Sequence, residues 1–234
     1  MRHLPNFITI LNLCCGCAAI VAIFNAEIPM AGILMLAAMV FDFLDGAVAR
    51  ILKAYSELGK QLDSLADMVS FGLAPGLLLY TLFLKGGTLA DMPAPVAAAG
   101  PWYMFSVTLF SALRLARFNI DTRQSTYFIG LPTPANSMLI LSVALIAEND
   151  DLGLSSLVSH PYFLLSLSTV SSWLLVAGIP LISLKFKSSD LKENLAPLLL
   201  LIASLILFIL FRFAAAPLII LLYVILSLLF PPHK

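Results

Sequence analysis

Charged side chains are scarce in this chain of 234 residues, where Asp, Glu, Lys and Arg together make up 11%. A soluble domain typically carries about 25% charged residues. Hydrophobic residues make up 61%, and the mean hydropathy is +1.01. No long polar linker and no internal repeat interrupts this composition. It excludes a water-soluble domain and predicts one integral membrane domain over residues 1–234, an all-α, multi-pass helical bundle.

Thiol and imidazole ligands are also few. The three cysteines crowd into the first apolar run, and the three histidines lie far apart along the sequence. Zinc sites place such ligands at wider spacing with partners elsewhere in the chain. We therefore expect neither a zinc site nor a disulfide framework, and interpret these residues as packing and interfacial side chains: Cys14, Cys15, Cys17, His3, His160 and His233.

Apolar segments between Gly, Pro and charge breaks are long enough for several spans, since a spanning helix needs about 20 mostly apolar residues. They are predicted at 7–25, 29–51, 58–84, 95–118, 133–148, 161–184, 194–211 and 214–230. The first resembles a signal peptide, but further spans follow and polar residues punctuate it, so we predict a retained helix. The C-terminal helices cover 161–230, and we split the apolar run 195–229 at Arg212 and Pro217. As one helix, that run would measure about 52 Å, beyond a hydrocarbon core of about 30 Å.

The basic residues fall unevenly on the two sides of these predicted spans. With a cytoplasmic N-terminus, eleven Lys and Arg residues face inside, and two, Lys85 and Arg212, face outside. The positive-inside rule expects this asymmetry. We therefore predict about eight transmembrane helices in the cytoplasmic membrane of a cell, with both termini in the cytoplasm and the acidic segment 148–151 outside.

Four aspartates interrupt the apolar sequence of the second and third predicted spans. An Asp at a helix centre in a membrane costs about 2.5–3.5 kcal/mol to insert, so such residues are rare and usually functional. They belong to a catalytic motif predicted at 42–67, the spaced string Asp42-x2-Asp45-Gly46-x2-Ala49-Arg50-x8-Gly59-x3-Asp63-x3-Asp67.

Each pair of aspartates is spaced to lie on one helix face, because residues three or four apart are neighbours on a helix. Counting about 1.5 Å per residue from Arg50 and Lys60 places both pairs within about 12 Å of the cytoplasmic ends of their helices. A short connection near 52–58 makes the two helices antiparallel neighbours. The carboxylates can then face each other around one or two divalent cations. Oxygen ligands favour Mg²⁺, Mn²⁺ or Ca²⁺ over zinc.

Other interpretations of this region stay open. The aspartates could hold a structural ion or pair with Arg50, and Gly46 and Gly59 are typical of tight helix packing in membranes. Intramembrane carboxylates also mark ion pathways, so a cation transporter is an alternative from another functional class. Transporter sites usually lie near the bilayer midplane. This cluster is predicted near one face, at the depth of lipid phosphates, which favours a lipid diphosphate as the ligand.

The spaced string resembles the signature of the CDP-alcohol phosphatidyltransferase family, D-x2-D-G-x2-A-R-x8-G-x3-D-x3-D, at every position. Other stretches resemble one branch of that family, the CDP-diacylglycerol–serine O-phosphatidyltransferases. They are Pro5-Asn6-x2-Thr9-x2-Asn12-Leu13, Ser70-Phe71-Gly72-x-Ala74-Pro75, Arg114-x2-Arg117-Phe118-Asn119 and Gly130-Leu131-Pro132-x-Pro134. The resemblance covers about residues 5–136.

This resemblance implies a metal-dependent transfer of a phosphatidyl group from CDP-diacylglycerol to L-serine, with release of CMP. Two divalent cations, Mg²⁺ or Mn²⁺, would be held by Asp42, Asp45, Asp63 and Asp67. Asp67 would also be the general base. The CDP pocket would be lined by Asn6, Thr9, Gly46, Ala49, Arg50 and Gly59. The resemblance further implies a homodimer with its active site facing the cytoplasm, and no nucleic-acid partner is expected.

The carboxylate of a serine acceptor needs a cation, and arginine suits it through a bidentate pair. Arg114, Arg117 and Arg123 follow near the cytoplasmic end of the fourth predicted span. We predict that Arg114, Arg117 and Asn119 bind the acceptor, although these arginines are also typical of positive-inside anchoring. Glycerol-3-phosphate or inositol phosphate is the alternative acceptor. A phosphorylated acceptor would need a stronger basic cluster than this sequence carries.

Overall fold

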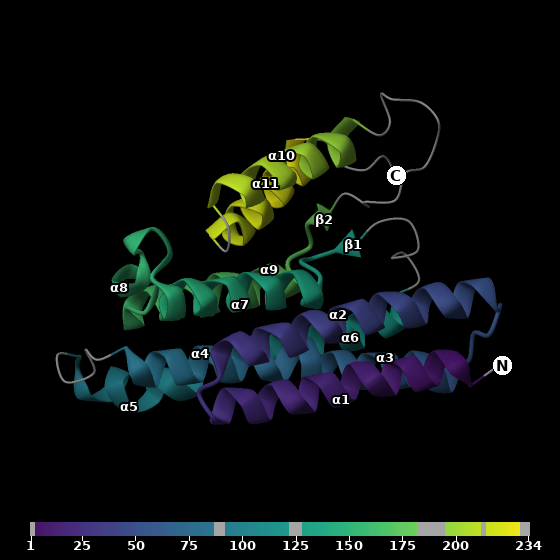
Figure 1. The fold of residues 1–234 in the computed structure, drawn as a ribbon, viewed down its shortest axis with the longest axis horizontal. Coiled ribbons are helices and arrows are strands. Elements are labelled where there is room, and N and C mark those ends of the chain that lie inside the picture. The colour runs from purple at the N-terminus through teal and green to yellow at the C-terminus, as the bar shows by residue number, and fades with distance from the viewer. Residues whose placement is uncertain (1–2, 87–91, 122–127, 182–194, 212–213, 230–234) are drawn as a thin grey trace.

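The computed structural model describes residues 3–86, 92–121, 128–181, 195–211 and 214–229 (Figure 1). The α-helices are α1 (Leu4–Phe24), α2 (Ile28–Ile51), α3 (Glu57–Asp67), α4 (Ala74–Lys85), α5 (Ala94–Tyr103), α6 (Ser106–Ile120), α7 (Thr133–Asn149), α8 (Ser155–Val158), α9 (Pro161–Val176), α10 (Leu195–Phe211) and α11 (Ala215–Leu229). A π-helix, η1 (Met68–Leu73), joins α3 to α4, and a 3₁₀ turn, η4 (Asp151–Gly153), precedes α8. Strands β1 (Phe128–Ile129) and β2 (Pro180–Leu181) form one short antiparallel pair. The helical fold class is confirmed.

Four helical segments of the described chain are long and apolar enough to cross a membrane: Leu4–Phe24, Ile28–Ile51, Glu57–Lys85 and Ala94–Ile120. Shorter apolar helices cover Pro161–Val176, Leu198–Phe211 and Ala215–Leu229. The predicted segment 161–184 is wrong at its end, because α9 stops at Val176 and β2 follows. Pro180 has no backbone N–H and cannot continue a helix. Residues 182–184 lie outside the described residues.

The third segment changes its helical geometry directly after the last aspartate. α3 ends at Asp67, η1 covers Met68–Leu73, and α4 carries Pro75 in its first turn. A proline removes one backbone hydrogen bond and its ring crowds the preceding turn. The wider π-turn accommodates that crowding within a continuous helical segment. Such π-turns are frequent at functional sites.

Small and hydroxyl-bearing residues let α1 and α6 approach η1 closely. A Cβ atom on Gly16 would overlap the hydroxyl of Ser70. Ser70 Oγ donates a hydrogen bond to Asn12 O at 3.1 Å, and Thr108 Oγ1 donates to Gly72 O at 2.9 Å. Close approach through small residues is typical of helix association in membranes. These contacts fix α1, η1 and α6 around the acidic residues.

The helices form layers (Figure 1). Helices α1 to α6 make one layer, α7, α8 and α9 lie on it, and α10 and α11 cross above them. Of the last two helices, α11 packs against α7 and β2, and α10 packs against α11. The start of α1 and the connection from α2 to α3 lie at one end of the molecule, whereas α5 and α8 lie at the other. The acidic residues of the string belong to the first of these ends.

Candidate active site

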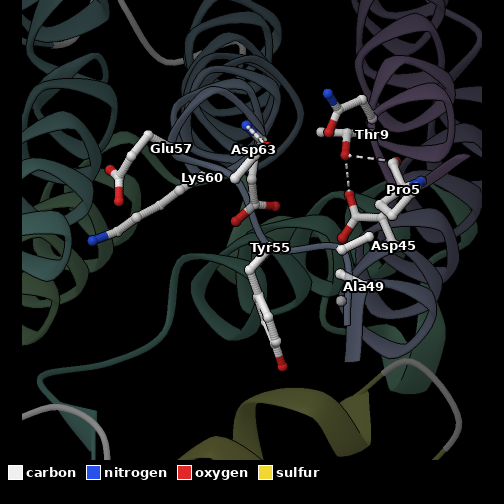
Figure 2. A pocket seen from close by; sticks show the side chains of 13 residues that line it. Pro5, Thr9, Asp45, Ala49, Tyr55, Glu57, Lys60 and Asp63 are labelled. Atoms are coloured by element: carbon white, nitrogen blue, oxygen red, sulfur yellow. Dashed lines mark hydrogen bonds between the residues drawn. The ribbon is translucent and has the colours of Figure 1, made fainter. Parts of the chain in front are cut away.

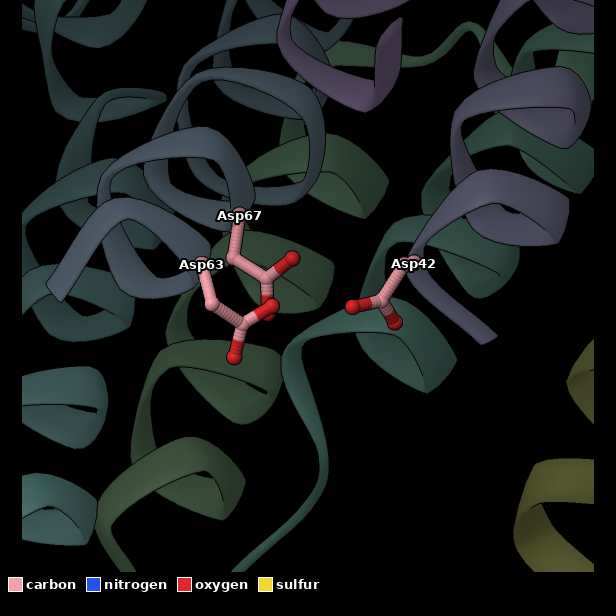
Figure 3. A group of neighbouring side chains, drawn as sticks. All are labelled: Asp42, Asp63 and Asp67. Carbon is pink, nitrogen blue, oxygen red and sulfur yellow. The ribbon is translucent and has the colours of Figure 1, made fainter. Parts of the chain in front are cut away.

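Three carboxylates from two helices meet in one cluster. Asp42 on α2 faces Asp63 and Asp67 on α3 (Figure 3). Each offers one carboxylate oxygen, and these three atoms lie within 4.8 Å of one another. The spacing of four residues places Asp63 and Asp67 on the same face of α3. We call these three residues the acidic triad; it contains three of the four aspartates predicted to converge.

Asp45 lies outside the acidic triad, one turn along α2 from Asp42. Its Oδ2 accepts a hydrogen bond from the hydroxyl of Thr9 on α1, drawn as a dashed line in Figure 2. The Thr9 hydroxyl also lies 3.1 Å from Pro5 O. Asp45 is buried, and it lines the same cavity as Asp63. The fourth carboxylate would therefore face a ligand in that cavity. The sequence spacing did not reveal that Asp45 is separate from the triad.

The basic side chains on these two helices form hydrogen bonds away from the acidic triad. Lys60 Nζ donates to Asn119 O at 2.7 Å, and Arg50 Nε donates to Gly46 O at 3.0 Å. Asp63 Oδ1 is buried and has no hydrogen-bond partner among the residues that the structure describes. Clustered carboxylates repel each other, and a buried oxygen without a partner is unfavourable. The donor set therefore fits a divalent cation that prefers oxygen ligands, such as Mg²⁺ or Mn²⁺.

A cavity of about 500 Å³ opens between the first turns of α1, the last turns of α2 and the start of α3 (Figure 2). Ligand pockets are commonly about 300–1,000 Å³ in volume. The cavity is lined by Pro5, Asn6, Thr9, Asp45, Gly46, Ala49, Ala54, Tyr55, Ser56, Glu57, Gly59, Lys60 and Asp63. Of the six residues predicted to contact CDP, all but Arg50 belong to this lining. Arg50 is exposed and turns back onto its own helix.

The two glycines of the string have different surroundings. Apart from the adjoining backbone of α2, no atom of the described residues lies within 4 Å of the position that a Cβ on Gly46 would take, so this face of α2 is open to the cavity. A Cβ on Gly59 would lie 3.0 Å from Asn6 Oδ1 and from Ser56 Oγ. Ser56 caps α3 by accepting a hydrogen bond from Gly59 N at 3.0 Å. Gly59 therefore allows α1 to pack against α3, whereas Gly46 leaves room for a ligand.

Arg114, one of the predicted acceptor residues, is buried rather than at the surface. It is 7% exposed, and its guanidinium carbon lies 5.8 Å from the centre of the Phe118 ring. Its Nη1 donates to Thr133 Oγ1 at 3.4 Å. It also interacts electrostatically with Asp67. Snorkelling to the membrane surface, the alternative explanation for this arginine, does not describe a side chain so enclosed.

The other predicted acceptor residues lie apart from Arg114. Arg117 is exposed, and its Nη1 donates to Val176 O at 3.5 Å. Asn119 Nδ2 donates to Ser64 Oγ at 2.8 Å, which ties the end of α6 to α3. Arg123 lies outside the described residues. Among the predicted acceptor residues, Arg114 is therefore the one that is buried and interacts electrostatically with a residue of the acidic triad, Asp67.

Asn12 is a site residue that the spaced string does not include. It is fully buried on α1, and its Nδ2 donates to Asp67 Oδ1 at 3.3 Å. Asn6, Thr9 and Asn12 recur every three residues, which places them on one helix face. That periodicity was a usable signal, because one polar face on an apolar helix must meet polar partners. Lys60 and Tyr55, which also line the cavity, have no comparable signal in the sequence.

The profile of the CDP-alcohol phosphatidyltransferase family matches residues 2–184 of this chain. The match includes every helix from α1 to α9 and both strands, together with the acidic triad and the cavity. Helices α10 and α11 lie outside it.

Relatives of this chain are about a third identical to it over the residues that align. The CDP-diacylglycerol–serine O-phosphatidyltransferase of Bacillus subtilis is 36% identical over 141 residues, which are 60% of this chain and 75% of that protein. The protein of the same name from Mycobacterium leprae is 35% identical over 191 residues, 77% of this chain and 58% of that protein. The archaetidylserine synthase of Methanothermobacter thermautotrophicus is 35% identical over 141 residues, 59% of this chain and 56% of that protein.

Proposed function

The chain belongs to the CDP-alcohol phosphatidyltransferase family, and we propose that it transfers the phosphatidyl group of CDP-diacylglycerol to the hydroxyl of L-serine. The products are phosphatidylserine and CMP. The observation that carries the proposal is the acidic triad beside a cavity of about 500 Å³. The names of the bacterial relatives support serine as the acceptor.

The acidic triad is the proposed metal site. Asp42, Asp63 and Asp67 would hold Mg²⁺ or Mn²⁺, and Asp45, which shares the cavity with Asp63, would complete a site for a second cation. When bound, such cations neutralise two charged phosphates and stabilise the leaving oxygen. The buried Asp63 oxygen without a partner supports this assignment.

The cavity is the proposed site of the CDP moiety. Asn6 and Thr9 contribute polar groups from α1, and the bare face at Gly46 admits the ligand against the backbone of α2. Ala49 and Gly59 complete these walls. We also assign Arg50 to a phosphate, because it stands on the last turn of α2 beside the cavity wall formed by Gly46. It would exchange its bond to Gly46 O for the phosphate.

Asp67 is the proposed general base. It takes the proton of the serine hydroxyl while the serine oxygen forms a bond to the lipid-linked phosphorus. The phosphoanhydride bond from that phosphorus to the oxygen of CMP breaks, so a phosphodiester to serine replaces the diphosphate linkage and CMP leaves. A carboxylate positioned for such proton transfer contributes about 10²–10⁴-fold to a rate. Asn12 supports this role, since its hydrogen bond to Oδ1 orients the carboxylate.

The acceptor assignment is tested with the purified full chain and CDP-diacylglycerol. CMP release is measured with L-serine, glycerol-3-phosphate and inositol phosphate in separate reactions, and the lipid product is identified by mass. We expect release with L-serine together with phosphatidylserine. Release that requires a phosphorylated acceptor would refute serine, and cation flux in proteoliposomes without CMP formation would refute the transferase.

We further propose that eight helical segments span the cytoplasmic membrane, with both termini and the active site on the cytoplasmic side. The uneven placement of basic residues supports this orientation. We also propose that the chain forms a homodimer, as the family resemblance implies. A mass measurement of the detergent-solubilised chain tests the dimer, and reporter fusions at the two termini test the orientation. Activity of a reporter that works only outside the cytoplasm would contradict the proposed orientation.

A further inference from the structure

A second group of buried polar residues lies where α6 meets α7. Ser111 and Arg114 come from α6, and Thr133 and Asn136 come from α7. Each pair is three residues apart and therefore shares a helix face. Ser111, Thr133 and Asn136 are fully buried, and Arg114 is 7% exposed. The hydrogen bond from Arg114 to Thr133 joins the two pairs. We call these four residues the α6–α7 polar cluster.

Several hydrogen-bonding groups in this cluster have no partner within the described part of the chain. They are Ser111 Oγ, Arg114 Nε, and both the amide nitrogen and the amide oxygen of Asn136. Buried polar atoms in native proteins are almost always paired. Several unpaired groups in one small region therefore indicate that a polar ligand, or water in its place, satisfies them. Together they offer a fixed positive charge, an amide donor, an amide acceptor and a hydroxyl.

The α6–α7 polar cluster lies on other helices than those that line the nucleotide cavity. That cavity is lined by residues of α1, α2, α3 and the connection between α2 and α3. The cluster instead flanks η1, which begins directly after Asp67 and packs against α6 and α7. A Cβ on Gly72 of η1 would lie 3.2 Å from Ser111 Cβ, and Arg114 interacts electrostatically with Asp67.

We propose that the α6–α7 polar cluster binds the acceptor, a small zwitterionic amino acid, and that Asn136 and Ser111 are specificity-determining residues alongside Arg114. The Arg114 guanidinium binds the carboxylate through charge-assisted hydrogen bonds. The amide oxygen of Asn136 and the Ser111 hydroxyl accept from the ammonium group. The hydroxyl of the amino acid then points toward Asp67. This inference rests on the proposed serine transfer.

Charge explains why this cluster selects an amino acid over a phosphorylated alcohol. A phosphate monoester carries close to two negative charges near neutral pH, and among these four side chains only Arg114 is cationic. A zwitterion brings one negative and one positive group, which matches one guanidinium and neutral acceptors. Burying a second, unpaired negative charge would be costly.

The experiment compares steady-state kinetics of the full chain and its Asn136→Leu variant, with L-serine and CDP-diacylglycerol varied in turn. Loss of hydrogen bonds to the acceptor should raise the KM for L-serine by about tenfold or more. The KM for CDP-diacylglycerol should change less than twofold. Asn149→Leu is the matched control, because Asn149 stands at the exposed end of the same helix and donates to Leu145 O of that helix at 2.8 Å. Its kinetics should stay at wild-type values.

Ser111→Ala provides a second variant, since it removes an unpaired hydroxyl and adds no bulk. It should raise the KM for L-serine about five- to tenfold, whereas a merely structural hydroxyl would leave that KM unchanged. An unchanged KM for L-serine in Ser111→Ala, or in a folded Asn136→Leu variant, overturns the inference while wild-type serine transfer still supports the proposed function. Absence of serine-dependent CMP release by the wild-type enzyme overturns the proposed function itself.

Discussion

The region around the acidic triad differs from the final pair of helices in how its side chains pack. Between α1 and η1, a glycine, Gly16, meets Ser70, and between α1 and α2 Thr9 bonds to Asp45. Helix α10 instead presents large apolar side chains, with Leu205 60% exposed and Ile209 69% exposed. In a membrane, lipid covers such residues. The polar residues of the candidate site thus lie on helices that approach closely, whereas α10 presents apolar surface.

Asp67→Asn should have the largest effect on activity and should show the contrast between the two regions most clearly. Removing the proposed base should lower kcat by about 10²–10⁴-fold, while membrane insertion and CDP-diacylglycerol binding persist. Turnover and binding of the labelled lipid nucleotide are measured on the same preparation. Glu148→Gln, at the end of α7 that leads into η4 and α8, is the control and should retain full turnover. Near-normal kcat in Asp67→Asn would remove this residue from the mechanism.

Asn12→Leu should have the next largest effect. The variant loses the hydrogen bond to Asp67 Oδ1 and keeps a side chain of similar size. Loss of a residue that orients a reactive or metal-binding group typically costs about 10–100-fold. We expect this loss in kcat with little change in either KM, because Asn12 acts through Asp67. If kcat stays constant and the KM for CDP-diacylglycerol rises instead, Asn12 contacts the nucleotide.

Gly46→Ala should raise the KM for CDP-diacylglycerol by about tenfold, equivalent to about 1.4 kcal/mol. The added methyl group meets no protein atom within 4 Å and projects into the proposed nucleotide site. Gly178→Ala is the matched control, since a Cβ there also meets nothing within 4 Å and lies outside the cavity. Equal kinetics for the two variants would show that nothing binds against Gly46.

Leu205→Ala should have the smallest effect. Substitutions of exposed residues usually change stability by less than about 0.5 kcal/mol, and lipid covers this position in the proposed orientation. We expect turnover within twofold of wild type and an unchanged melting temperature in detergent. A large loss of activity would show that α10 takes part in the site or in a subunit interface, and would break the contrast between the two regions.

Sequence spacing predicted the helices and much of the site for identifiable reasons. Apolar runs determine where helices can lie in a membrane, and separations of three and four residues determine which aspartates share a face. Spacing within one helix cannot reveal partners on another. The bond from Thr9 that engages Asp45, the burial of Arg114 and the unpaired amide of Asn136 all depend on contacts between distant segments. The end of α9 was missed because hydrophobicity continues past it.

The π-helix after Asp67 sets the rotational phase between two halves of one transmembrane segment. Upstream of it, Asp63 and Asp67 turn toward α2; downstream, Leu78 and Phe83 turn into the apolar core. Each residue of an α-helix advances the side chains by about 100°. If Met68–Leu73 wound as a regular α-helix with the same number of residues, the carboxylates would therefore rotate away from Asp42 relative to the apolar side chains downstream. The geometry of this one turn thus determines whether the segment directs its carboxylates at α2 or is an ordinary hydrophobic helix.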